Sequence, residues 1–279
     1  LEFQKANIIK AIEQLLKPSL VFVLFYFFRK IETIFIAQLI ATFFILLISL
    51  YIVPLKKTSF DFRIFREKVA TIYKIGFFVY LVWAIDIVFR TADRWIISEF
   101  YSLGELARYG FTSNLALNIW LIALIFCAPY SQVVFKLVAE DKYNDVKKVI
   151  IRTNNKLYLF TFVISLITII SYPFLLELVI KKYYGTELLF FTLVLSSLFL
   201  SFNTMYIYYM ISNNAHFILL KYQLLTLTIN IFLNFIFLIY HVNIIYYSYS
   251  TILSSVIYFI LVRRFFYYSI QKKINIIQE

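Results

Sequence analysis

Charged residues are scarce in this sequence. They account for 15% of its 279 residues, and 62% of the residues are hydrophobic. A soluble globular domain carries about a quarter charged residues and roughly half apolar ones. The mean hydropathy is +0.83. This composition excludes an ordinary water-soluble domain and predicts an integral membrane protein.

Cysteine and histidine are almost absent. The only cysteine, Cys127, lies inside an apolar run, which excludes a disulfide framework and a thiol-bound metal cluster. The only histidines are His216 and His241, so no His-rich metal site is expected. We therefore expect neither a metal nor another cofactor.

The apolar runs also lack the alternation of period two that a membrane β-strand shows over about ten residues. The segment "FFILLISLYIV", for example, is apolar at every position. Since only helices and closed barrels satisfy the backbone in hydrocarbon, and a helix crosses it in about 20 residues, we expect an all-α polytopic protein with eight transmembrane helices. The predicted spans are residues 8–28, 34–53, 75–97, 109–135, 157–176, 188–211, 222–240 and 244–262.

The distribution of Lys and Arg predicts the orientation. If residue 1 is cytoplasmic, 20 of the 27 Lys and Arg residues fall in the inner segments and seven in the outer ones. Positive residues remain on the cytoplasmic side of short loops, so both ends are predicted to be cytoplasmic. The net charge of +12 then reflects topology and contact with anionic lipid rather than nucleic-acid binding.

The connections between the spans are short on the outer side, at residues 29–33, 98–108, 181–187 and 241–243. Membrane enzymes that act on lipid-linked sugars usually carry catalytic groups on a long extramembrane segment, so we do not expect an enzyme. The longest inner connections, residues 54–71 and 136–156, are predicted to be surface helices. The sequence begins with Leu1 rather than Met, and we expect that an N-terminal part is missing.

Two polar stripes lie inside predicted spans. Asn114 and Asn118 are four residues apart, and Thr226, Asn230 and Asn234 repeat at the same spacing, so each set shares one helical face. Hydrogen bonds between helices, worth about 0.6 kcal/mol each, are one explanation. A polar cavity wall that binds sugar hydroxyls is the other.

The stretch "DIVFRTADRW" places four charges at the end of an apolar run. Asp86, Arg90 and then Asp93 or Arg94 follow one helical face. Each charge inside a span costs about 2.5 to 3.5 kcal/mol on insertion scales, and such residues usually face a bundle interior or a water-filled cavity. The alternative is that Asp86 and Arg90 neutralise each other within the helix, while Asp93 and Arg94 reach the outer interface.

The stretch "TADRWIISEFYSLGELARYGFTSNLALNIW" resembles the outer end of the seventh helix, the loop and the eighth helix of the Wzx-type O-antigen and capsular polysaccharide flippases. The resemblance rests on the Asp93-Arg94 pair, Ser102, the Glu105-Leu106 pair and Tyr109. The stretch "YYGTELLFFTLVLSSLF" is similar to the loop and tenth helix of the same family. This family belongs to the multidrug, oligosaccharidyl-lipid and polysaccharide export superfamily.

The resemblance implies twelve spans in two lobes, with this chain holding spans five to twelve. Residues 1–57 would be the last two helices of the N-terminal lobe. Residues 58–74 would be a cytoplasmic amphipathic connector, residues 75–264 the six-helix C-terminal lobe, and residues 265–279 a cytoplasmic tail.

The resemblance also implies a function, which is the transfer of an undecaprenyl-pyrophosphate-linked oligosaccharide across the bacterial inner membrane by alternating access. The expected partners are this glycan, membrane lipids, and the polysaccharide polymerase and chain-length machinery. A pyrophosphate in a low-dielectric cavity needs positive charge, which Arg90 would supply, while Asp86 would take up a coupling proton or sodium ion. Asn114, Asn118, Asn230 and Asn234 would bind the glycan, and Asp93 and Arg94 would form the outer mouth.

Three other classes of function remain open at the level of sequence. A drug or metabolite exporter of the same superfamily shares every topological feature. A membrane polysaccharide polymerase or sugar acyltransferase would need a long outer loop. In a structural membrane protein without a transport path, the charged face would pack against a neighbouring helix with no water between them.

Overall fold

The computed structural model describes the whole chain except residues 1, 31, 53–61, 179 and 279. Within the described part there are nine α-helices, one short 3-10 helix and no strand, which confirms the predicted all-α fold. The elements are α1 (Glu2–Phe28), α2 (Glu32–Ile52), α3 (Phe62–Phe100), α4 (Leu103–Ala139), α5 (Tyr143–Leu178), η1 (Lys181–Tyr183), α6 (Glu187–Phe202), α7 (Thr204–Ser212), α8 (His216–Ile239) and α9 (Ile245–Gln278).

Six helical segments among the described residues are long and apolar enough to cross a membrane. They are α2, α4, α5, the consecutive pair α6 and α7, α8, and α9. The apolar part of α1, Leu15–Phe28, is shorter than a span. The charged stretch of residues 86–94 lies within α3. The total of eight spans therefore stays a prediction.

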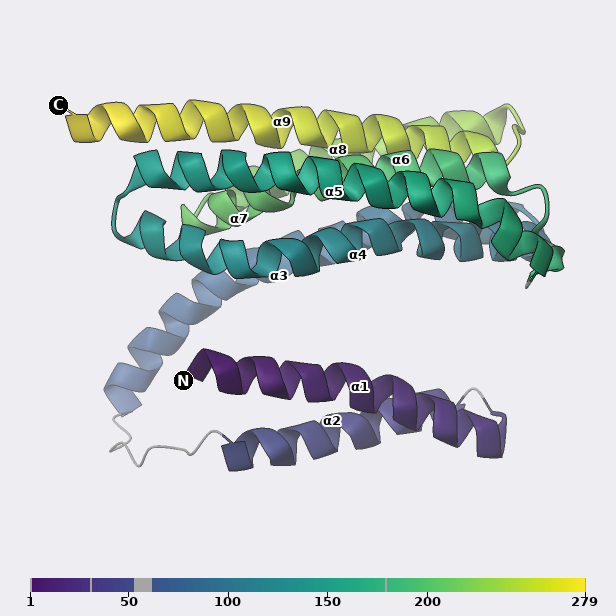
Figure 1. Ribbon diagram of the computed structural model, residues 1–279, viewed down its shortest axis with the longest axis horizontal. Helices are drawn as coiled ribbons and strands as arrows, with labels where there is room; N and C mark the ends of the chain where they lie inside the picture. Colours follow the sequence, from purple (N-terminus) through teal and green to yellow (C-terminus); the bar gives the residue numbers. More distant parts are fainter. Residues whose placement is uncertain (1, 31, 53–61, 179, 279) are drawn as a thin grey trace. The chain divides into compact units, whose positions relative to one another are not determined.

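The chain forms two compact units, Leu1–Lys68 and Val69–Glu279. In the first, α1 and α2 lie side by side as a hairpin (Figure 1). The buried positions of α2 are Thr33, Ala37 and Ala41, whose small side chains at a spacing of four let two helices approach closely. The predicted connector, residues 58–74, falls partly outside the described residues. From Phe62 onward the connector is helical and forms the beginning of α3.

The second unit is a bundle of α3, α4, α5, the pair α6 and α7, α8 and α9 (Figure 1). Helix α6 has the central position because it packs against α4, α5 and α9. Hydroxyl side chains lie along its seam with α9, where Thr192 Oγ1 is 2.6 Å from Ser248 Oγ and Ser196 Oγ is 2.9 Å from Ser255 Oγ. Such small polar residues allow close packing and supply hydrogen bonds between apolar helices.

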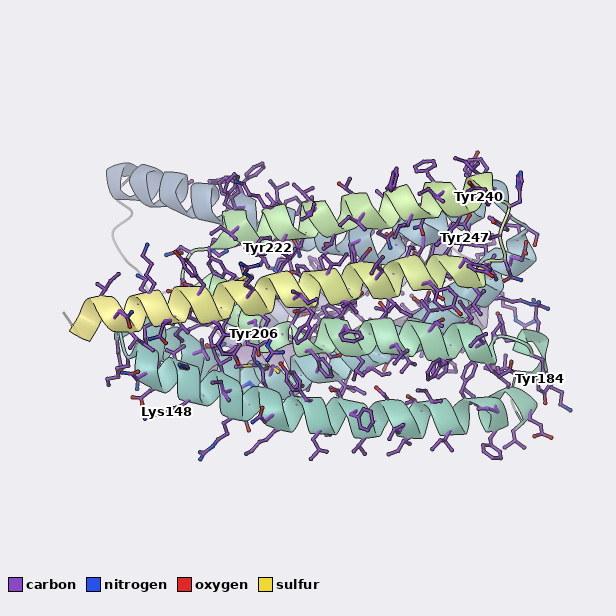
Figure 2. The ribbon with its side chains drawn as sticks, turned by 90° about the horizontal axis from the view of Figure 1, so that it is seen from above. Lys148, Tyr184, Tyr206, Tyr222, Tyr240 and Tyr247 are labelled. Atoms are coloured by element: carbon purple, nitrogen blue, oxygen red, sulfur yellow. The ribbon has the colours of Figure 1, made fainter. Side chains whose placement is uncertain are left out.

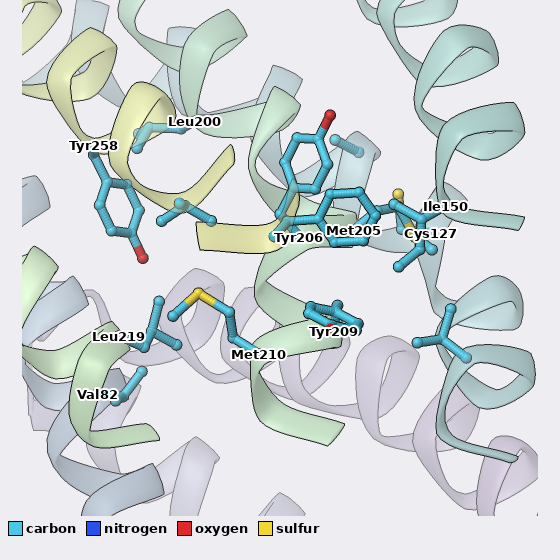
Figure 3. Packing of buried hydrophobic residues seen from close by; sticks show 14 of the residues in the cluster. Val82, Cys127, Ile150, Leu200, Met205, Tyr206, Tyr209, Met210, Leu219 and Tyr258 are labelled. Carbon is cyan, nitrogen blue, oxygen red and sulfur yellow. The ribbon is translucent and has the colours of Figure 1, made fainter. Parts of the chain in front are cut away.

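Two hydrophobic clusters fill the interior of this bundle. One gathers Met205, Tyr209 and Met210 of α7 with Leu219 of α8 and Val82 of α3 (Figure 3). The other surrounds the stacked rings of Tyr172 and Phe190, whose centroids are 3.9 Å apart, and includes Ile97, Tyr109 and Tyr247. Together they fix the bundle near both of its ends.

The turns between the helices are tight. Four of them contain a non-glycine residue with left-handed backbone, namely Arg29 (φ 50°), Asp141 (φ 54°), Asn214 (φ 55°) and His241 (φ 47°). Asp, Asn and His are residue types enriched in that conformation. Most of the predicted inner connection at residues 136–156 is an extension of the spans themselves, because α4 continues to Ala139 and α5 begins at Tyr143.

Candidate functional site

Asp86 and Arg90 form an ion pair on α3. Arg90 Nη2 lies 2.6 Å from Asp86 Oδ2, and both side chains are mostly buried, with exposed fractions of 17% and 16%. Arg90 Nε also donates a hydrogen bond to the Asp86 carbonyl oxygen at 3.2 Å. The guanidinium carbon is 4.2 Å from the ring centroid of Trp120 on α4, a cation–π contact that strengthens where water is excluded. Arg90 is thus held by one carboxylate and one aromatic ring.

A cavity of about 40 Å³ lies beside this pair. Its lining includes Asp86 and Trp120 together with Thr204, Gln223 and Tyr258. Asp86 Oδ2 in this lining is the oxygen that pairs with Arg90, whereas Gln223 Oε1 and the Tyr258 hydroxyl have no hydrogen-bond partner in the described part of the chain. A polar cavity above about 10 to 15 Å³ can hold a water molecule. Most of the cavity wall is apolar, and these buried groups give it one polar side; we call the cavity the polar chamber after them.

The interruption between α6 and α7 lies next to this chamber. The helix breaks at Asn203, between Phe202 and Thr204, and Leu200, Thr204 and Ile207 on either side of the break line the cavity. Asn203 is fully buried, and neither side-chain polar atom has a partner within the described residues. The backbone of Asn203 remains right-handed helical (φ −77°, ψ −21°), and its N–H donates to the Leu200 carbonyl oxygen at 3.2 Å, so the interruption is a one-residue irregularity within a single apolar segment.

Asp93 lies at the centre of a second polar contact. Its carboxylate is 4% exposed and accepts hydrogen bonds from the Tyr109 hydroxyl of α4 and from Thr251 Oγ1 of α9 at 3.5 Å. The backbone N–H of Arg94 donates to its other oxygen at 2.9 Å. The residue predicted for the outer mouth thus links three helices inside the bundle.

Arg94 differs from Arg90 in its surroundings. Its Nε and Nη2 atoms are buried, yet they have no hydrogen-bond partner among the residues that the structure describes. A guanidinium offers five donors in a planar fork that suits phosphate oxygens. The Nε and Nη2 groups of Arg94 are therefore available as donors to a ligand, and Arg94 lies one helical turn from Arg90.

Asn114 and Asn118 are exposed on the outer face of α4. Along α4 they lie between Tyr109 and Trp120, which contact Asp93 and Arg90, so the two amides lie at the depth of the charged stretch. The neighbouring positions of the same face, Leu121 and Ile125, are exposed and apolar. Two adjacent amides thus interrupt an apolar face.

Asn230 and Asn234 of α8, unlike Asn114 and Asn118, are buried in the bundle. They are 1% and 0% exposed. Asn234 Nδ2 donates to Asn230 Oδ1 at 3.1 Å, Ser250 Oγ of α9 donates to Asn234 Oδ1, and Asn230 Nδ2 lies 3.4 Å from Ser250 Oγ. This is the interhelix packing that the sequence left open as an explanation for the stripe. The structure therefore separates two stripes that look alike in the sequence.

Sequence patterns did not single out Gln223, Tyr258 or Trp120. Gln223 lies three residues before Thr226, so an extension of the polar stripe by one turn would have included it. Tyr258 is one of 23 tyrosines, and nothing in its sequence neighbourhood marks it as part of a polar chamber. Its position became clear only from the packing of α9 against α8.

No protein-family model, curated protein or solved structure matches this chain. The resemblance to polysaccharide flippases therefore rests on the two stretches quoted for it.

Proposed function

We propose that this chain is a flippase that moves an undecaprenyl-pyrophosphate-linked oligosaccharide across the bacterial inner membrane by alternating access. Six helical segments with the length and apolarity of membrane spans support a membrane location. The polar chamber between helices, with the buried Asn203 next to it, supports a transport role over a purely structural one.

The exposure of Asn114 and Asn118 is the observation that carries the proposal. An amide without a hydrogen-bond partner costs free energy in hydrocarbon, and polar groups within spans usually face a cavity or a bundle interior. Since these two amides point away from the bundle of the second unit, we assign their face to the water-filled transport path. Amide groups both donate and accept hydrogen bonds, which suits the hydroxyls of a glycan.

The pyrophosphate needs a cationic partner in this path. Arg90 and Arg94 are four residues apart on α3 and so lie on the same helical face. Arg94 has unpartnered donors, and Arg90 is held by Asp86. We assign the pyrophosphate to both guanidinium groups, because bidentate contacts from two arginines match its several oxygens.

The Asp86–Arg90 pair suggests how transport couples to an ion. A proton or sodium ion that reaches Asp86 through the polar chamber would neutralise its carboxylate. Arg90 would then lose its partner and become available to the pyrophosphate, since a guanidinium remains charged at any physiological pH. Ion uptake and substrate binding would thus favour each other through one shared residue.

Replacement of both exposed amides tests the proposal. We expect the double variant Asn114→Leu, Asn118→Leu to insert normally, because the face becomes more apolar, and to lose most glycan transport. The measurement is surface polysaccharide in a flippase-null strain at matched membrane abundance. Thr228→Leu is the matched control, because it makes the same kind of change at an exposed position of α8 and should retain transport.

Normal surface polysaccharide in the double variant would refute the assignment of this face to the path. Loss of drug efflux with intact glycan transport would favour the exporter of the same superfamily instead.

A further inference from the structure

One outward face of α5 changes from basic to apolar within a single helical turn. Lys148, Arg152 and Lys156 are spaced by four residues, so they lie along one stripe. The same stripe continues with exposed apolar side chains, namely Leu159, Val163, Leu166, Ile170 and Phe174. We call the whole row the α5 stripe. Packed residues such as Ile150 and Leu157 occupy the opposite face.

The basic end of the α5 stripe borders an open surface hollow of about 700 Å³. Its lining holds four cations, Lys147, Lys148, Arg152 and Lys156, together with Asn155. The carboxylate nearest to any of them is Asp145, which is 3.6 Å from Lys148. Within the described residues, Lys147, Arg152 and Lys156 form no ion pair. The hollow therefore carries a net positive charge, since three of its four cations have no acidic partner among the residues that the structure describes.

The acidic group at the turn before α5 is already engaged. Glu140 pairs with Lys142 at 2.7 Å, and the Lys142 ammonium holds the pKa of this carboxyl below its ordinary value. Lys136 is also within 3.9 Å of Glu140. Glu140 is therefore balanced by Lys142 and Lys136, neither of which lines the hollow.

The apolar part of the α5 stripe is longer than one membrane leaflet. From Leu159 to Phe174 the helix rises about 22 Å at 1.5 Å per residue, and half of the hydrocarbon core is about 15 Å thick, so an acyl chain of one leaflet would cover the part from Leu159 to Ile170. The cations begin one turn before Leu159, at the level where lipid headgroups would lie. Figure 2 shows Lys148 at the end of the bundle opposite to Tyr184, which is where this leaflet would meet water.

We propose that the α5 stripe is a binding site for one anionic phospholipid of the leaflet that surrounds the first turns of α5. The headgroup phosphate lies in the basic hollow, and an acyl chain lies along Leu159, Val163 and Leu166. This proposal rests on the proposed membrane location, but not on flippase activity.

Charge and geometry together favour this occupant. A soluble phosphate would use the cations and make no contact with the apolar row, whereas a neutral lipid would use the row and leave Lys147, Arg152 and Lys156 without an ion pair among the described residues. Each basic residue at a membrane surface contributes about fivefold to the partitioning of an anionic lipid. Clusters of four or more Lys and Arg at this position are typical of anionic-lipid recognition.

Site-specific quenching of fluorescence tests the proposal. A dye is attached to Leu159→Cys in the full chain, reconstituted in vesicles with brominated phosphatidylglycerol or brominated phosphatidylcholine. The native Cys127 is fully buried, so the dye reports position 159. Leu224→Cys is the matched site, because it is exposed and lies three residues after the single cation Lys221, as Leu159 lies three residues after Lys156.

We expect phosphatidylglycerol to quench the dye at position 159 at least fivefold more effectively than phosphatidylcholine does, with little preference at position 224. Lys148→Gln, Arg152→Gln and Lys156→Gln together should remove this preference. The triple variant Arg264→Gln, Lys272→Gln, Lys273→Gln has the same net charge and should keep it. These side chains are exposed, and the single variant Arg152→Gln, with an expected loss of about fivefold, serves if the triple variant does not fold.

Three results would overturn the proposal. One is equal quenching by both lipids at position 159, and another is an equal loss of preference in the two triple variants, which would indicate bulk electrostatics. The third is displacement by millimolar inorganic phosphate at constant ionic strength, which would indicate a phosphate site. No quenching by either lipid at both dye positions would refute the membrane location itself.

Discussion

Asp86 and Asp93 lie seven residues apart on α3, yet their surroundings differ. Asp86 borders a polar chamber and is balanced by Arg90. Asp93 is enclosed by hydroxyl donors from Tyr109 and Thr251. A buried carboxylate is costly unless such partners satisfy it, so Asp93 is suited to holding three helices together. Asp86, which is paired with Arg90 and borders the cavity, is suited to exchange of an ion.

Substitutions at Asp86 and Arg90 test the coupling at the residue scale. We expect Arg90→Ala to abolish glycan transport, and Arg90→Lys to retain part of it, because lysine keeps the charge but lacks the planar fork for phosphate oxygens. Asp86→Asn should leave Arg90 permanently without its carboxylate partner. Transport by Asp86→Asn is therefore expected to become insensitive to pH and sodium.

The measurement is uptake of a lipid-linked glycan by proteoliposomes over a range of pH and sodium concentrations. A structural role for the pair would instead lower protein abundance in all three variants without any change in ion dependence. Normal transport by Arg90→Ala would remove the cation from the proposed site.

At the scale of single elements, the two asparagine stripes illustrate what a helical spacing can and cannot predict. The spacing of four correctly placed Asn114 with Asn118 and Asn230 with Asn234 on common faces. It contains no information on which face meets a neighbour, because that depends on the packing of other helices. The exposed stripe on α4 and the buried stripe on α8 became distinguishable only when α9 supplied Ser250 as a partner.

Asn234→Leu tests the packing role of the α8 stripe. The substitution removes a hydrogen bond to Asn230 and one from Ser250, and interhelix hydrogen bonds in membranes are worth about 0.6 kcal/mol each on average. We expect a lower thermal unfolding temperature in detergent, by an amount equivalent to about 1 to 2 kcal/mol, with transport retained at permissive temperature.

Thr228→Leu, on the exposed side of the same helix, should leave the unfolding temperature unchanged. If Asn234→Leu unfolds like the unchanged protein but fails to transport, then Asn234 contacts the substrate and the packing explanation is wrong.

At the scale of the whole molecule, hydrophobic runs predicted the all-α fold because lipid leaves so few ways to satisfy a backbone. Element ends were less predictable. The segment at residues 136–156 was expected to form separate surface helices, but α4 and α5 extend through it to a turn at Asp141. The one-residue interruption at Asn203 was not predicted either, since "LSFNTMY" contains neither proline nor glycine and Asn203 keeps right-handed helical backbone.

The proposed orientation of the bundle is testable by cysteine labelling from either side of the membrane. The positive residues predict a cytoplasmic turn between α4 and α5 and an external loop after α5. Asn144 is exposed near the first site, and Tyr184 is 46% exposed in the second. Thr186 is a poor probe for that loop because it is 3% exposed and hydrogen-bonded to Tyr172.

We expect an impermeant maleimide added to intact cells to label Tyr184→Cys and to spare Asn144→Cys until the membrane is opened. Cys127 supplies the internal control, because its burial should prevent labelling under both conditions. Labelling of Asn144→Cys in intact cells, with Tyr184→Cys protected, would mean that the bundle is inverted and that the basic end of α5 lies outside, which would contradict the orientation predicted from the positive residues.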